Sequence, residues 1–100
     1  MHNVFYVTTG PRGLKLGISS NGGSIRLDQH RRAGYGDQTV RLWTKLPGRL
    51  ADDTEDLVLT RLKGAGHQPI QGHEYFGIEL LPVVLGIADR ELKWFEPRDQ

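Results

Sequence analysis

The stretch that decides the fold is residues 3–32, NVFYVTTGPRGLKLGISSNGGSIRLDQHRR. It begins with Val4–Val7, a run of β-branched and aromatic residues that favours a β-strand. Gly10–Gly13 follows with the sequence Gly-Pro-Arg-Gly, whose glycines and proline supply the backbone angles of a tight turn. A second strand is expected to begin near Lys15, in the sequence Lys-Leu-Gly-Ile. We therefore expect a β-hairpin in which Tyr6 and Lys15 lie on neighbouring strands.

A short basic helix is expected after the hairpin. Ser-Ser-Asn-Gly-Gly at residues 19–23 predicts a loop, and Ser24 is a suitable N-cap for a helix that ends near Arg32. Arg26 and His30 are four residues apart on this helix, so their side chains leave the same face one turn apart. The helix therefore presents a guanidinium and an imidazole side by side.

The rest of the chain predicts one more strand and two more helices. Alternation over residues 39–45 favours a strand, in which Trp43 either packs on a helix or lies exposed as a stacking platform. Apolar side chains recur at helical spacing over residues 49–63, and Pro82 suits the first turn of a last helix that runs to about Phe95. The residues of this last helix that are expected to close the core are Val83, Val84, Ile87, Ala88, Trp94 and Phe95.

Together these elements predict an α+β fold. We expect one domain over residues 1–100, with a three-stranded antiparallel sheet flanked by three helices and a frayed tail over about residues 96–100. A chain of this length can bury one core but has no room for a separate substrate-binding domain. Long-range target recognition would therefore require a partner protein or a second copy of the chain.

Composition excludes several classes of protein. The chain has no cysteine, which rules out disulfides, cysteine zinc sites and a cysteine nucleophile. No apolar run approaches the roughly 18 residues that a membrane-crossing helix needs, and nothing resembles a signal peptide. We therefore expect a cytoplasmic protein that has no membrane partner.

Charge is unevenly distributed along the chain. Residues 1–49 contain eight Lys and Arg and two acids, whereas residues 50–100 contain five Lys and Arg and ten acids. A folded domain can present such a division as one basic face for a polyanion. The residues expected to contact nucleic acid on that face are Arg12, Arg31, Arg32 and Tyr35. The alternative is ordinary surface charge that is mixed in space once the chain folds.

Glu55 is the most unusual residue of the helix expected over residues 49–63. It falls on the apolar side of that helix, beside Leu59. A carboxylate there loses water, and ionised groups are rarely buried alone, so the position calls for a cation, a metal ion or a hydrogen-bond network. The alternatives are a glutamate that reaches solvent at the rim of the core, or one that pairs with Lys15 or Arg26 for structural reasons.

These residues together resemble the GIY-YIG nuclease superfamily, in particular its compact branch that is common in phages and bacteria. The resemblance spans roughly residues 3–90 and rests on Tyr6, Lys15-Leu16-Gly17, Arg26, His30, Glu55 and Gly72-His73-Glu74-Tyr75-Phe76. Two positions depart from the motifs that name the family. Val4-Phe5-Tyr6 stands in place of Gly-Ile-Tyr, and Lys15 stands in place of the second tyrosine.

The resemblance implies a divalent-metal-dependent endonuclease that hydrolyses the phosphodiester bonds of DNA. Tyr6, Lys15, Arg26 and His30 would be catalytic, and Glu55 would bind Mg²⁺ or Mn²⁺. Arg26 would neutralise charge on the phosphorane, and Tyr6, whose reference pKa is about 10, would need nearby cations to act as a base or to orient water. Alternatively, Lys15 only anchors a phosphate and His30, whose reference pKa is about 6.5, accepts the proton.

The sequence leaves open the role of Glu74 and two alternative functions of the chain. Glu74 lies in a segment similar to a Gly-Glu-aromatic-Phe element of the compact branch, so it is an accessory site candidate, with a surface role as the alternative. Because the second tyrosine is missing, the chain could be a nucleic-acid-binding module that does not cut. A small protein-interaction domain that blocks or recruits a host factor is the other alternative, and a phage-encoded chain would act in the cytoplasm of its host.

Overall fold

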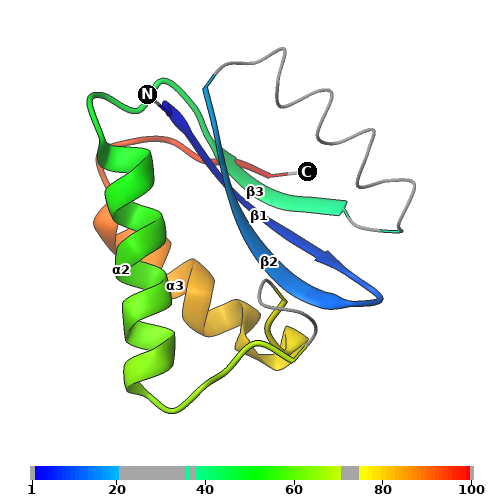
Figure 1. Cartoon of the computed structure of the whole chain (residues 1–100). Coiled ribbons are helices and arrows are strands. Elements are labelled where there is room, and N and C mark those ends of the chain that lie inside the picture. Colours follow the sequence, from blue (N-terminus) through cyan, green and yellow to red (C-terminus); the bar gives the residue numbers. More distant parts are fainter. Residues whose placement is uncertain (1, 21–35, 37, 71–74, 100) are drawn as a thin grey trace.

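The computed structural model describes residues 2–20, 36, 38–70 and 75–99. Its elements in chain order are β1 (Val4–Gly10), β2 (Gly13–Ser19), β3 (Gln38–Trp43), α2 (Leu50–Gly64), the 3-10 helix η1 (Ile78–Leu80), α3 (Leu81–Glu91) and β4 (Arg98–Asp99) (Figure 1). The predicted α+β class is confirmed, while the helix expected from Ser24 to Arg32 lies outside the described residues. Within the described segments, no helix has both the length and the apolar character needed to cross a membrane.

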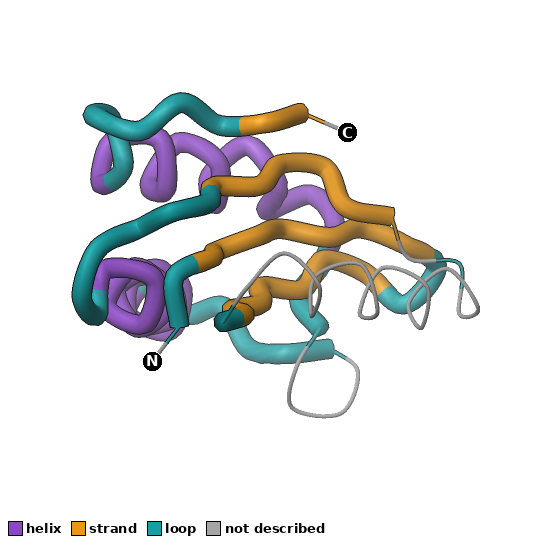
Figure 2. The backbone as a smooth tube through the Cα atoms, turned by 90° about the horizontal axis from the view of Figure 1, so that it is seen from above, coloured by secondary structure: helices purple, strands orange, loops and turns teal. Residues whose placement is uncertain are grey.

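Antiparallel pairing joins the four strands into one sheet in the order β2-β1-β3-β4 (Figure 2). The predicted hairpin is confirmed, because β1 pairs with β2 along its whole length and Gly10 faces Gly13 at the turn. The three long strands form the predicted antiparallel sheet. The end of the chain differs from the prediction of a frayed tail, because Arg98–Asp99 pairs with Leu42 and Arg41 of β3 and adds a short fourth strand.

One face of the sheet carries the main core. Phe5 and Val7 of β1 point to this face, and α2 and α3 pack on it (Figure 1). The buried residues of this core are Phe5, Val7, Leu14, Leu16, Trp43, Leu46, Ala51, Val58, Leu62, Phe76, Leu80, Val84, Ala88 and Leu92. Trp43 is fully buried, and its ring centroid lies 5.7 Å from that of Phe5. Packing is therefore the role of Trp43, and the stacking-platform alternative is excluded.

The opposite face of the sheet buries a smaller cluster. Its members are Val4 and Tyr6 of β1 and Leu42 of β3. Successive side chains of a strand point to opposite faces, so the central strand β1 contributes to both clusters and its first five residues are all buried. Tyr6 therefore lies on the face that α2 and α3 do not cover.

The helix α2 agrees with the sequence prediction. Its buried residues Ala51, Val58 and Leu62 form the expected apolar side, and Leu59 packs beside them partly buried. Thr54 is also buried, and its hydroxyl donates to the carbonyl oxygen one turn earlier at 2.7 Å. This bond satisfies a polar group that would otherwise be costly to bury.

The helix α3 ends at Glu91, earlier than predicted. Val84 and Ala88 are fully buried, as expected. Trp94 is 84% exposed and Val83 is 47% exposed, so the prediction that these two residues close the core is wrong. Because the helix stops before Trp94, this residue no longer follows the helical spacing that would turn it inward, and the chain instead returns to pair with β3.

Candidate functional site

The side chain of Tyr6 lies over a glycine of the neighbouring strand β2. Tyr6 pairs with Gly17 of β2 and is only 3% exposed. A Cβ atom added to Gly17 would lie 2.6 Å from the hydroxyl oxygen of Tyr6 and would overlap the ring itself. The ring therefore fills the space that a side chain at Gly17 would take. Because β2 is an edge strand of the sheet, the phenol reaches outward over that edge strand.

Lys15 shares the Tyr6 face of β2. It pairs with Thr8 of β1 and stands two residues before Gly17, and residues two apart on a strand point to the same face. Its side chain is partly buried. The prediction that Tyr6 and Lys15 lie on neighbouring strands is thus confirmed, and the structure adds that both side chains emerge on the same face.

Tyr75 joins these residues from a distant part of the chain. Phe76 forms an antiparallel bridge with Leu14 on the outer edge of β2, through two backbone hydrogen bonds of 2.8 Å. The bridge places the Tyr75 ring beside two cations. The Arg12 Cζ lies 4.6 Å from the ring centroid, and the Lys15 Nζ lies 6.0 Å from it.

Sequence reasoning missed Tyr75. In the segment that contains it, the sequence singled out Glu74, which lies outside the described residues. The signal that could have found it is strand alternation. If Phe76 faces the core, its neighbour Tyr75 must face the side on which Tyr6 lies.

Glu55 is partly buried on α2. Loss of solvent raises its pKa above the ordinary value of 4.5, and the negative charges of Asp56 and Asp52 raise the pKa further. The positive charges of His2 and Lys15 act in the opposite direction and lower it. The contribution of Lys15 is the smallest of these, and Lys15 emerges on the face of the sheet opposite to α2. An additional cation at Glu55 would therefore be favourable.

The carboxylate of Asp52, near Glu55 on α2, already has a partner in His2. The Nδ1 atom of His2 lies 2.9 Å from Oδ1 of Asp52, in the first turn of α2. Burial raises the pKa of Asp52, but the hydrogen bond and charge of His2, with the charge of Arg49, outweigh burial and leave this pKa lowered. Asp52 is therefore ionised near neutral pH, and its negative charge raises the pKa of Glu55.

Glu55→Gln is expected to stabilise the fold at neutral pH. A raised pKa means that the folded state binds the proton more tightly than the unfolded state, so this stabilising contribution is complete at low pH and is lost as the pH rises through the folded-state pKa. Glutamine keeps the shape without the charge. Solvent screens this partly buried group, so we expect a gain of well under about 1 kcal/mol in the free energy of unfolding near neutral pH, and no gain below about pH 4.

Urea unfolding of the wild type and the variant at the two pH values measures this difference. The matched control is Glu91→Gln, at an exposed acid of α3 that should give no gain at either pH. A lower stability of Glu55→Gln at neutral pH would show that the carboxylate makes a net favourable structural pair, which is the alternative raised by the sequence.

A metal ion at Glu55 would have few protein ligands among the described residues. Over residues 2–20, 38–70 and 75–99, no three His, Asp or Glu side chains gather in a group that could hold a metal ion. Mg²⁺ usually keeps several waters and binds one or two carboxylates together with a substrate phosphate. Glu55, with the negative charges of Asp52 and Asp56 near it, fits such a site.

The structure does not place all the predicted site residues that it describes on one face of the sheet. Tyr6 and Lys15 share the face that α2 and α3 leave uncovered, and Arg12 lies in the turn after β1, beside Tyr75. Glu55 belongs to α2, which packs on the opposite face, and the charge of Lys15 makes the smallest contribution to its pKa. The other predicted site residues lie outside the described part of the chain, and they are Arg26, His30, Arg31, Arg32, Tyr35 and Glu74.

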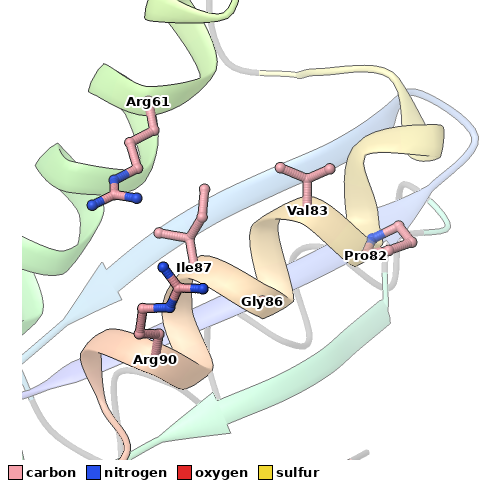
Figure 3. A pocket seen from close by; sticks show the side chains of 6 residues that line it. All are labelled: Arg61, Pro82, Val83, Gly86, Ile87 and Arg90. Carbon is pink, nitrogen blue, oxygen red and sulfur yellow. The ribbon is translucent and has the colours of Figure 1, made fainter.

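An open groove of about 290 Å³ lies elsewhere, between α2 and α3 (Figure 3). Its lining residues are Arg61, Pro82, Val83, Gly86, Ile87 and Arg90. Figure 3 shows the side chains of Arg61, from α2, and Arg90, from α3, extending toward the space between the helices. The lining includes none of the predicted site residues, so the groove is separate from the group around Tyr6 and Lys15.

No protein-family profile, curated protein or solved structure matches the chain. Function is therefore inferred from the residues of the chain and their geometry.

Proposed function

We propose that the protein is a compact GIY-YIG-type endonuclease that hydrolyses DNA phosphodiester bonds with one divalent metal ion, Mg²⁺ or Mn²⁺. The observation that carries the proposal is the environment of Glu55. This carboxyl group is partly buried, its pKa is raised by lost solvent and by two acidic neighbours, and the charge of Lys15 acts on it. Acidic neighbours make an added cation at this carboxylate favourable, which supports a metal ligand at this position.

Tyr6 is the group that we assign to the attacking water. A phenol with an ordinary pKa of about 10 is a weak base at neutral pH unless a positive field acts on it. Lys15 supplies a positive charge on the same face of the sheet, two residues from the Gly17 over which the Tyr6 ring lies. Tyr6 thus orients the water or accepts its proton, and Lys15 supports the ionised phenol or anchors the phosphate.

Glu55 is the residue that we assign to the metal ion. When bound, a hydrated divalent ion stabilises the charge that develops on the leaving oxygen. Only the ionised carboxylate binds the ion, so the raised pKa of Glu55 makes metal binding weaken as the pH falls toward that value. The positive charges of His2 and, to a smaller extent, Lys15 keep this pKa from rising further.

The remaining roles rest on the resemblance. Arg26 would neutralise the phosphorane with its planar guanidinium, and His30 would transfer a proton. The proposed DNA contacts are Arg12, Arg31, Arg32 and Tyr35, with Glu74 as an accessory residue. The excess of Lys and Arg in residues 1–49 supports a DNA partner.

Glu55→Gln tests the proposal. Wild-type protein should nick supercoiled plasmid when Mg²⁺ or Mn²⁺ is added, and the variant should lose this activity by on the order of 100-fold or more, because the metal ligand is gone. Glu91→Gln, at an exposed acid of α3, is the matched control and should nick like the wild type.

Each other outcome of this assay contradicts the nuclease assignment. Equal nicking by wild type and Glu55→Gln would remove Glu55 from the mechanism and point to a contaminating activity. Retention of DNA that weakens with salt, without any nicking, would identify a nucleic-acid-binding module. If the wild type neither retains nor nicks DNA, a protein-interaction domain is the remaining alternative.

A further inference from the structure

Tyr75 is held rigidly at the outer edge of β2. Its neighbour Phe76 makes two backbone hydrogen bonds of 2.8 Å with Leu14, and its own carbonyl oxygen accepts a hydrogen bond of 2.6 Å from the Ile70 N–H. The close approach depends on Gly13, because a Cβ there would overlap the carbonyl oxygen of Phe76. The Tyr75 side chain is only 6% exposed, so its ring is packed in place at this edge.

Two cations lie over this one ring. The guanidinium carbon of Arg12 lies 4.6 Å from the ring centroid, and the ammonium nitrogen of Lys15 lies 6.0 Å from it. Both distances are within the range in which the negative face of an aromatic ring attracts a cation, about 6 Å. The positive charges of Arg12, in the turn, and Lys15, in β2, repel each other. The Tyr75 ring attracts both cations, and this attraction offsets part of the electrostatic free energy that bringing them together costs.

We propose that Tyr75 is a positioning residue that orders Arg12 and Lys15 as a pair of phosphate-binding cations. The proposal deepens the nuclease assignment and rests on it for the identity of the ligand, a nucleic acid backbone. Long cationic side chains lose rotamer freedom when they bind a phosphate, and side chains that are already ordered lose less. Tyr75 itself touches neither the phosphate nor the metal ion.

The geometry can be tested apart from any activity. Side-chain protons of Arg12 and Lys15 that lie over the Tyr75 ring should show upfield NMR shifts caused by the ring current. These shifts should persist in Tyr75→Phe, which keeps the ring, and vanish in Tyr75→Leu, which removes it. Absence of the shifts in the wild type would overturn the proposal. This result depends on the wild type alone, so it can be judged even if Tyr75→Leu does not fold.

The functional consequence is tested by DNA binding without metal. The salt dependence of affinity for a short fluorescent duplex should be measured in EDTA for the wild type, Tyr75→Phe and Tyr75→Leu. We expect Tyr75→Leu to weaken binding by about three- to tenfold and to reduce the slope of log affinity against log salt by about 1, which is one lost phosphate contact. Tyr75→Phe should match the wild type.

Matched variants separate positioning from packing. Phe76→Leu truncates the neighbouring core residue and should lower the stability, while the salt slope stays as in the wild type. In an Arg12→Gln/Lys15→Gln background, Tyr75→Leu should have no further effect on binding, because the cations that it orders are gone. The proposal would be overturned if Tyr75→Leu weakened DNA binding just as much in that double-variant background. It would also be overturned by an unchanged salt slope in folded Tyr75→Leu, or by equal losses of DNA affinity in Tyr75→Leu and Tyr75→Phe.

Failure of this inference and failure of the nuclease assignment are distinguishable. Wild-type protein that binds DNA with the expected slope but never nicks it would refute the endonuclease and leave the role of Tyr75 intact. Wild-type protein that nicks DNA, with binding insensitive to Tyr75→Leu, would refute the role of Tyr75 alone. Wild-type protein without salt-dependent DNA binding would refute both.

Discussion

Gly17→Ala is expected to lower metal-dependent nicking about 100-fold and to lower the stability of the fold. The new Cβ would overlap the ring of Tyr6, which is 3% exposed and packs with Val4 and Leu42. The ring must therefore leave its position over β2. Overpacking of this kind costs about 1–3 kcal/mol, and a displacement of about 1 Å in a catalytic group can lower the rate about 100-fold. Urea unfolding and plasmid nicking measure the two effects.

Gly86→Ala in α3 is the control for this substitution. A Cβ at Gly86 meets no atom within 4 Å, and alanine is a better helix former than glycine, so the control should be neutral or slightly more stable. Its nicking should equal that of the wild type. If Gly17→Ala kept wild-type stability and activity, the position of Tyr6 over Gly17 would have no importance for the site.

Gly13→Ala is expected to have the largest effect on stability. Gly13 has a φ of +117°, which side chains rarely adopt, and its Cβ would overlap the carbonyl oxygen of Phe76. That oxygen belongs to the backbone and accepts the Leu14 N–H, so it cannot move away without breaking the bridge between β2 and Tyr75–Phe76. Backbone strain and two lost hydrogen bonds together cost on the order of 3 kcal/mol.

Gly48→Ala separates the two causes. Gly48 also has a positive φ, +53°, but a Cβ there meets no atom within 4 Å. It should therefore cost only about 1 kcal/mol, from strain alone. Urea unfolding gives both values, and hydrogen exchange at the Leu14 and Phe76 amides reports the bridge directly. Equal costs for Gly13→Ala and Gly48→Ala would show that the bridge contributes nothing to stability.

The hairpin and the α2 helix could be predicted because their signals are local. The Gly-Pro-Arg-Gly turn between two apolar runs fixes which strands pair, and the apolar side of α2 follows from spacing alone. The same spacing indicated that Glu55 would be partly buried. That its pKa depends on His2 and Lys15 could not be predicted, because this requires the packing of α2 against the sheet.

The end of the chain shows why other features escaped prediction. Trp94 continues the apolar pattern of α3, but the helix ends at Glu91 and leaves Trp94 exposed, with the Lys93 Nζ 5.3 Å from its ring centroid. Pairing of β4 with β3 is non-local, and a two-residue strand carries no periodic signal. The placement of Tyr75 depends in the same way on a bridge between residues that are more than 60 positions apart.

A direct test of the central claim is the NMR signal loss that Mn²⁺ causes in ¹⁵N-labelled protein, with and without a short DNA duplex. Paramagnetic Mn²⁺ broadens the amide signals nearest to it. If Glu55 binds the metal ion, the amides around Glu55 in α2 should broaden first in the wild type, and they should not broaden in Glu55→Gln. Broadening centred on other acids, or the same pattern in the variant, would contradict the metal site and with it the proposed nuclease.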